Sequence, residues 1–261
     1  MPSAKITPES VIVLPCFNEE KRLDRESFLE FAAAHPDCLM LFVNDGSTDQ
    51  TSARLEEIRN AAPDRVEILN LPENRGKAEA VRRGFLLAFE VDPKFIGFWD
   101  SDLATPLKHI DTMINILKAN LPVEMVFSTR SPNFSEKIER AFYRHALGNF
   151  FAYVCSLFFR LPVYDTQCGA KIFRNSPELR HAFEKPFLTK WLFDIEIYAR
   201  LAAQDHTGSI ISKVHDYSLP FWKDINGSKL QWKDYLISAM QFLKLYRAYP
   251  VLHANSRKKL T

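Results

Sequence analysis

Short apolar runs alternate with longer segments whose apolar residues recur at helical spacing through the first half of the chain. Runs of mostly apolar residues predict buried strands at residues 11–15, 39–43, 66–70, 95–99 and 124–128. Amphipathic helices are predicted between them, at residues 21–34, 50–61, 78–90 and 106–118. Because strands and helices alternate, we expect βαβ units and an α/β fold, with a mostly parallel central sheet flanked by helices.

The second half of the chain carries two helical patterns rich in aromatic residues. Residues 138–161 predict a long helix whose apolar face is wider than is needed to pack one side of the helix against a core. Residues 235–249 predict a second helix, which also carries Lys244 and Arg247. Such helices can cover the sheet, pair in a homodimer, or lie at a membrane interface with their basic residues at the rim. The pattern alone leaves these three interpretations open.

Polar residues gather where the predicted strands end. These residues are Asn18, Glu19, Asp45, the segment 74–77, Asp100 and Asp102. In sheets of this kind ligands bind outside the carboxyl ends of the strands, so we expect one polar rim to form the binding site. Each residue taken alone could instead be an ordinary turn or helix-capping residue.

The segment 95–106 carries the most specific chemistry. Asp100 and Asp102 are two carboxylates one residue apart, directly after a buried strand and before Thr105 and Pro106, which are predicted to begin a helix. Hard cations such as Mg²⁺ and Mn²⁺ prefer oxygen ligands and share their coordination with water and substrate phosphates. The pair therefore indicates a metal–diphosphate site, with turn and helix caps as the structural alternative.

Composition limits the class of protein. The chain has 261 residues, of which 46% are hydrophobic and 25% charged, which is enough for one large α/β domain. Its net charge of +2 is too small to indicate a nucleic-acid partner. The four cysteines form no CxxC pair, no signal segment is recognisable, and the longest apolar run, residues 146–159, is shorter than the ~20 residues that span a bilayer. We expect a cytoplasmic protein with free thiols and no transmembrane helix.

Three other enzyme classes fit the motifs less well. A haloacid-dehalogenase phosphatase should carry its Asp-x-Asp pair on an early strand followed by glycine, where this chain has Leu103 after three βα units. A Rossmann dehydrogenase needs GxGxxG after the first strand, which residues 15–18 do not provide. A sugar nucleotidylyltransferase should have a glycine-rich basic loop at the same place, and none is present.

Four ordered motifs resemble those of family 2 glycosyltransferases with the GT-A fold. They are VIVLPCFNEE at 11–20, VNDGSTD at 43–49, NRGK at 74–77 and DSD at 100–102. Further segments at 165–173, 191–196 and 222–229 resemble the dolichyl-phosphate β-glucosyltransferase branch, so the likeness covers about residues 9–246. Eukaryotic members of that branch carry an amino-terminal membrane anchor, which we do not expect here.

The resemblance implies a single GT-A domain over residues 1–250. Within it, residues 9–130 would form the nucleotide-sugar-binding half and residues 131–250 the acceptor-binding half, followed by a basic tail at 251–261. Asp102 would bind Mg²⁺ or Mn²⁺, and Asp45 would accept hydrogen bonds from the base of the nucleotide. The residues implied in nucleotide-sugar binding are Pro15, Phe17, Glu19, Asp45, Asn74, Lys77, Asp100, Ser101, Gln167 and Gly169.

The resemblance also assigns roles in the second half. Asp194 and Glu196 are two residues apart on a predicted helix and cannot share a face, and we choose Asp194 as the catalytic acid. It would act as general base toward a hydroxyl acceptor, or orient the sugar if the acceptor is an already ionised lipid phosphate. Arg130, Trp222 and Lys229 would bind the acceptor.

These implications describe an inverting, metal-dependent transferase. It would move a sugar, glucose from UDP-glucose in the first instance, to a polyprenyl phosphate at the membrane surface. The aromatic helices would then contact the membrane or form a homodimer. The alternatives are a glycosyltransferase with a soluble hydroxyl acceptor, and an inactive relative that binds a membrane or a partner. The paired acids, which an inactive relative would be expected to lose, are present.

Overall fold

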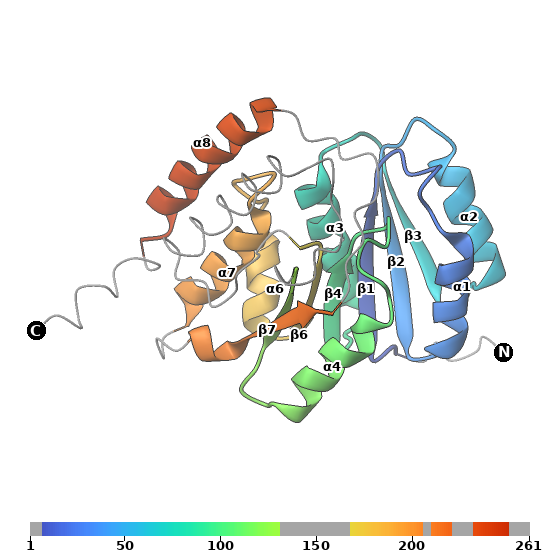
Figure 1. Cartoon of the computed structure of the whole chain (residues 1–261), viewed down its shortest axis with the longest axis horizontal. Helices are drawn as coiled ribbons and strands as arrows, with labels where there is room; N and C mark the ends of the chain where they lie inside the picture. Colours follow the sequence, from blue (N-terminus) through green and yellow to red (C-terminus); the bar gives the residue numbers. More distant parts are fainter. Residues whose placement is uncertain (1–6, 131–167, 206–209, 221–231, 251–261) are drawn as a thin grey trace, which may run out of the picture.

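A seven-stranded sheet forms the centre of the molecule (Figure 1). The computed structural model describes residues 7–130, 168–205, 210–220 and 232–250, and side chains between residues 232 and 239 are not described. The strand order is β3-β2-β1-β4-β6-β5-β7. Every neighbouring pair is parallel except the two pairs that β6 makes with β4 and β5. The predicted α/β fold with a mostly parallel sheet is confirmed.

The first half follows the predicted alternation. Its strands are β1 (Ser10–Cys16), β2 (Cys38–Asp45), β3 (Val66–Leu71), β4 (Phe95–Trp99) and β5 (Met125–Arg130). Its helices are α1 (Arg25–Ala34), α2 (Thr51–Ala61), α3 (Lys77–Glu90) and α4 (His109–Ala119). All five strands and all four helices were predicted from the sequence pattern.

The second half adds elements that the pattern did not predict. They are β6 (Ala170–Arg174), α6 (Pro177–Glu184), the short 3₁₀ helix η2 (Ile210–Lys213) and β7 (Val214–Leu219). Two more helices match the predictions: α7 (Phe193–Gln204) holds Asp194 and Glu196, and α8 (Trp232–Ala248) corresponds to the predicted helix at 235–249. The predicted helix at 138–161 and the basic tail at 251–261 lie outside the described residues.

Two predicted helices begin later than expected. The helix predicted from residue 21 begins at Arg25, because the side chain of Asp24 accepts the backbone N–H of Ser27 and caps the first turn there. The helix predicted from Pro106 begins at His109, and the preceding residues form tight turns in which His109 donates to the carbonyl of Pro106. Thr105 and Pro106 therefore belong to the loop after β4.

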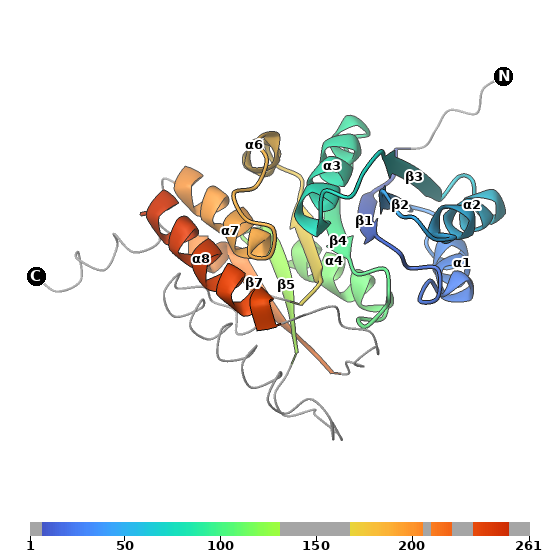
Figure 2. The same cartoon turned by 90° about the horizontal axis from the view of Figure 1, so that it is seen from above.

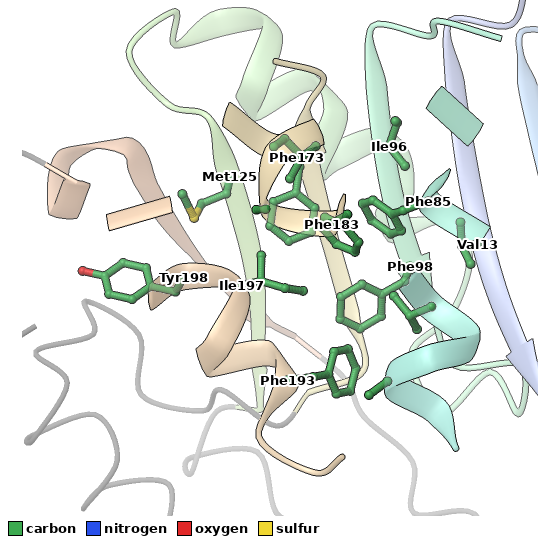
Figure 3. Close-up of a cluster of buried hydrophobic side chains, with 14 of the residues drawn as sticks. Val13, Phe85, Ile96, Phe98, Met125, Phe173, Phe183, Phe193, Ile197 and Tyr198 are labelled. Carbon is green, nitrogen blue, oxygen red and sulfur yellow. The ribbon is translucent and has the colours of Figure 1, made fainter. Parts of the chain in front are cut away.

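Alternating strand residues supply two cores, one on each face of the sheet. Figure 2 shows α3 and α6 on one side and α4 on the other. On the face of α3, α6 and α7, buried phenylalanines pack ring against ring, and Phe85 stacks on Phe183 with ring centroids 4.1 Å apart (Figure 3). The opposite core lies under α1, α2 and α4. Much of the high aromatic content is therefore buried packing, which fixes the strand ends that carry the polar rim.

None of the helices that the structure describes is long and apolar enough to span a bilayer.

Candidate active site

Asp45 joins two loops at the carboxyl edge of the sheet. It is the last residue of β2, is buried, and accepts backbone N–H groups through both carboxylate oxygens: Oδ1 from Arg75 at 2.9 Å and Oδ2 from Gly76 at 2.8 Å. The loop after β3 is thus held against the end of β2. Because each carboxylate oxygen has a further lone pair, the side chain can still accept a hydrogen bond from a ligand. Its role toward the nucleotide base stays a prediction.

Gly46 makes this approach possible. Its φ is +64°, and a Cβ there would lie 2.5 Å from the backbone carbon of Glu73. A side chain at this position would therefore be strained and would push the two loops apart. On the other side, Asn18 accepts the N–H of Thr48 at 2.9 Å, so the loop after β1 is attached to the same assembly.

Lys77 links the loop held by Asp45 to the acid pair. It is the first residue of α3, and its Nζ lies 2.5 Å from Asp100 Oδ1. Burial alone would lower the pKa of Lys77, but the nearby carboxylates of Asp100, Asp194 and Asp102 outweigh it and raise this pKa. The lysine is therefore a firm positive charge among three acids, placed at a helix N-terminus where phosphate groups bind well.

Asp102 is the second acid of the pair and is partly buried. Its Oδ1 accepts the N–H of Ala104 at 3.1 Å, and its Oδ2 lies 3.6 Å from the guanidinium of Arg22. The intervening Leu103 has a φ of +55°, a strained conformation for leucine that accompanies the sharp turn after β4. Burial, and then the negative charge of Asp100, raise the pKa of Asp102.

The carboxylates of Asp100 and Asp102 suit a hard divalent cation. Two carboxylates that disfavour each other's charge would be stabilised by a cation between them, and their oxygens are the ligand type that Mg²⁺ and Mn²⁺ take. Among the residues that the structure describes, no group of three His, Cys, Asp or Glu side chains gathers as a metal site. A metal held here would complete its coordination with diphosphate oxygens and water.

Gly169 is the surface against which Asp100 lies. The carbonyl of Gly169 accepts the N–H of Asp100 at 2.9 Å, and a Cβ on the glycine would lie 1.8 Å from Asp100 Oδ2. The resemblance implies that Gly169 takes part in nucleotide-sugar binding, and this stays a prediction. The structure shows that the group approaching it is the Asp100 carboxylate.

We expect Gly169→Ala to displace Asp100 and weaken metal-dependent nucleotide binding by at least about tenfold, because a displacement of the order of 1 Å in a site is costly. The measurement is calorimetric titration of UDP in the presence of Mn²⁺. Gly84→Ala is the matched control, because its Cβ would also meet a neighbouring atom, at 2.3 Å from a methyl group of Val13, but in the core between α3 and β1. Unchanged UDP affinity in Gly169→Ala would contradict the prediction.

Asp194 faces the acid pair from α7. It is buried, and its Oδ1 lies 3.0 Å from Nζ of Lys171 on β6. Burial raises the pKa of Asp194, and the charges of Lys171 and Lys77 offset only part of this effect. Lys77, Asp100 and Asp194 therefore belong to one electrostatic group, which the sequence reasoning had assembled from separate motifs.

Glu196 points elsewhere, as the helical spacing predicted. It is fully buried and accepts the backbone N–H groups of Leu188 and Thr189, and it pairs with Arg200 at 2.7 Å. Its carboxylate holds the loop that precedes α7. Of the two acids on this helix, only Asp194 is directed toward the rim.

The other predicted residues divide into three groups. Ser101 is tied to the end of β1, because its Oγ donates to the carbonyl of Pro15 at 3.1 Å. Residues that lie at the same edge, in loops or at a strand end, are Phe17, Glu19, Asn74 and Arg130. Residues that lie outside the described part of the chain are Gln167, Trp222 and Lys229. The ligand contacts of all these residues stay predictions.

Two charged residues in the site were not given roles from the sequence. Arg22 was placed inside a predicted helix, yet it lies in the turn before α1 and reaches both Glu19 and Asp102. Lys171 is part of the AKIFR segment, whose alternation is too short to indicate a strand, and no sequence pattern shows that a lysine is buried. Only the antiparallel pairing of β6 reveals its place.

Comparisons with known proteins agree with the geometry. A model of the family "Glycosyl transferase family 2" matches residues 11–179. The dolichyl-phosphate beta-glucosyltransferase of Drosophila melanogaster is 31% identical, and the match covers 88% of this chain and 72% of the fly protein. The enzyme of the same name from Mus musculus is 29% identical, with 91% of this chain and 76% of the mouse protein covered.

Solved structures share the fold. The mannosyltransferase of Pyrobaculum calidifontis in complex with GDP-Man and Mn²⁺ has a TM-score of 0.62 and 14% identity, covering 95% of this chain and 69% of that chain. Glucosyl-3-phosphoglycerate synthase of Mycobacterium tuberculosis with Mn²⁺ and UDP-Glc has a TM-score of 0.61 and 17% identity, covering 93% and 79%. At these identities the likeness concerns the fold alone, which is GT-A as predicted.

Proposed function

The chain belongs to glycosyltransferase family 2, and from this premise we propose that it transfers glucose from UDP-glucose to the phosphate of a polyprenyl lipid, with inversion at the anomeric carbon. The acceptor and sugar are those named by the fly and mouse relatives, and UDP-Glc is the donor named for the solved mycobacterial relative. Dolichyl phosphate is the corresponding lipid acceptor.

The rim residues suit a nucleotide sugar. Asp45 has capacity to accept from the base, and Ser101, Pro15 and Glu19 line the ends of the adjoining strands. Asp102, together with Asp100, would hold Mg²⁺ or Mn²⁺, which when bound neutralises the charge of the diphosphate leaving group. Lys77 can turn from Asp100 to the same diphosphate, because 39% of its side chain is exposed even though its charged end lies among the acids.

The observation that supports a lipid acceptor is an apolar surface next to the site. We call it the α7–α8 surface, and its exposed apolar side chains are Leu188, Trp191, Met240 and Leu243. The loop before α7 and helix α8 are joined by two hydrogen bonds, from Trp191 N to Gln241 Oε1 and from Lys244 Nζ to the carbonyl of Leu188, both 3.0 Å. Exposed large apolar residues gathered in this way mark an interaction surface.

The α7–α8 surface is continuous with the nucleotide rim. Lys190, in the same loop, lies about 4 Å from the Cβ position of Gly76, which precedes Lys77 at the start of α3. Basic residues beside exposed Trp and Leu suit an anionic lipid headgroup at a membrane surface. We therefore propose peripheral membrane association through this surface, which would bring a lipid phosphate to the acids.

Asp194 is the proposed catalytic carboxylate. In the transfer, an oxygen of the acceptor phosphate forms the bond to the anomeric carbon, and the bond from that carbon to the diphosphate breaks with its electron pair left on UDP. As a carboxylate, Asp194 can accept hydrogen bonds from the sugar hydroxyls and take up the proton of an acceptor that arrives protonated. Attack opposite the leaving group inverts the anomeric configuration.

The test is transfer from radiolabelled UDP-glucose to dolichyl phosphate in lipid vesicles with Mn²⁺, against GDP-mannose as donor and glycerol 3-phosphate as soluble acceptor. We expect extractable glucolipid only with UDP-glucose and the lipid acceptor. Thermal unfolding runs in parallel, where UDP at ~100 times its dissociation constant should add roughly 2.7 kcal/mol with Mn²⁺ and less with EDTA.

Each other outcome overturns a stated part of the proposal. Product on the soluble acceptor alone would contradict the lipid acceptor, and product from GDP-mannose alone would contradict the donor. Stabilisation by UDP and Mn²⁺ with no transfer to either acceptor would identify an inactive nucleotide-binding relative.

A further inference from the structure

Lys171 is a charged residue with no exposed surface. Its side chain has a relative exposure of 0% and points into the sheet face under α7, where Nζ lies 5.1 Å from the ring centroid of Phe98 and 5.3 Å from that of Phe127. Figure 3 shows Phe98 beside Phe193, the residue before Asp194. Taking an ammonium group out of water costs several kcal/mol, so its partners must explain why it is there.

Within the described part of the chain the ammonium has two polar partners, and both adjoin the proposed active site. It lies 3.0 Å from Asp194 Oδ1 and donates to the carbonyl of Cys168 at 2.5 Å. Cys168 precedes Gly169, whose carbonyl accepts the N–H of Asp100 and whose lack of a side chain leaves room for the Asp100 carboxylate. One buried cation thus connects the proposed catalytic acid on α7 to the turn that supports the acid pair.

A purely structural role explains this arrangement poorly. Buried ion pairs are weak evidence for stability, and apolar residues of similar volume at such positions are often as stabilising or more so. The rings of Phe98 and Phe127 already lie beside the end of the Lys171 side chain, so a methionine would pack well there. The charge is therefore better explained by what it does to Asp194.

We propose that Lys171 is the positioning residue of the active site: it keeps Asp194 ionised and holds its carboxylate in register with Asp100 and Asp102. The inference rests on the proposed role of Asp194. Among the described residues, the charged groups around Asp194 are Lys171 on β6, Lys77 at the start of α3 and Asp100 directly after β4. Lys77 is free to turn toward the diphosphate during the reaction, whereas the buried Lys171 remains beside Asp194.

The test is Lys171→Met, with Lys171→Arg as the conservative variant and Arg174→Met as the matched control on the same strand. Arg174 also donates to backbone carbonyls from a partly buried position, but these are on the far side of the sheet, at Leu117 and Val123. We expect Lys171→Met to lower kcat by about 10- to 100-fold with little change in KM for UDP-glucose. The acid limb of its pH profile should move up by about one unit or more, because the loss of an opposite charge disfavours the carboxylate.

Lys171→Arg should restore most of the wild-type pH profile, and Arg174→Met should leave it unchanged. A Lys171→Met enzyme with wild-type kcat and pH profile would overturn the inference. If this variant fails to fold, the double variant Lys171→Met/Asp194→Asn, which removes the unpaired buried charge, replaces it: it should transfer no more slowly than Asp194→Asn alone. A further large loss would overturn the proposal.

A readout independent of transfer separates this inference from the proposed function. The carboxyl-carbon NMR signal of Asp194, assigned by its loss in Asp194→Asn, can be titrated in wild type and in Lys171→Met. A higher apparent pKa in the variant supports the inference even if no acceptor is found, and an equal pKa refutes it even in an active enzyme.

Discussion

Asp102→Asn is expected to lower the rate of glucosyl transfer by about 10²–10³-fold, the usual effect of losing one electrostatic group aimed at developing charge. Asn keeps the shape of the side chain and can still accept the N–H of Ala104. What it loses is the negative oxygen that faces Arg22. The concentration of Mn²⁺ needed for half-maximal rate should rise in the same variant.

The measurement is initial transfer rate against Mn²⁺ concentration at saturating UDP-glucose. Asp111→Asn serves as the control, because Asp111 is an exposed acid on α4 that pairs with His35 away from the rim. Its rate and metal dependence should match wild type. An Asp102→Asn enzyme with unchanged rate and unchanged metal dependence would remove Asp102 from the metal site.

Asp194→Asn is expected to lower kcat by about 10²–10⁴-fold, the range for loss of a positioned acid–base group. The amide cannot accept a proton, and it cannot pair with Lys171 as a charge. Donor binding should survive, because Asp194 lies on α7 while the nucleotide rim is built from the loops after β1 to β4. The variant should therefore still be stabilised by UDP and Mn²⁺.

The transfer rate of the wild-type enzyme should depend on pH through the ionisation of Asp194. Burial raises the pKa of Asp194, so its active carboxylate form should be lost on acidification at a pH above the usual ~3.9 of aspartate. The rate should rise with pH through this limb, and the limb should be absent in Asp194→Asn. Glu196→Gln is the control on the same helix: it should unfold at lower temperature, because Glu196 holds Leu188 and Thr189, but keep the limb.

The sequence predicted the first half of the fold well because its strands are strongly apolar. The run at 95–99 is β4 to the residue, since it is buried on both faces and ends at two acids. Strands β6 and β7 were missed for the opposite reason. Residues 170–174 place Lys171 and Arg174 within a five-residue strand, and β7 includes His215 and Asp216, so neither segment has the apolar run of a central strand.

The site residues that lie at the ends of parallel strands could be predicted from the sequence. The contacts that join loops to one another could not. Asp45 and Asp100 follow strands that both neighbour β1, so their shared edge follows from the topology. The clamp of Asp45 on residues 75–76 and the pairing of Lys77 with Asp100 depend on loop conformation, which has no sequence period. The contact of Gly169 with the Asp100 carboxylate likewise depends on where β6 pairs with β4.

The position of β6 between β4 and β5 also matters for the folding of the chain. The strand pairs with β4 at Phe95 and Arg174 and with β5 at Met125 and Phe173, so it fills a gap between strands made much earlier by the ribosome. A nascent chain that ends near residue 130 would expose two open sheet edges, which invite aggregation until the missing strand arrives. The same strand delivers Lys171, and the residue before it is the glycine that supports Asp100. One strand therefore both covers the two open sheet edges and places Lys171 beside Asp194, so we expect a chain that lacks β6 to be prone to aggregation and to lack the proposed site.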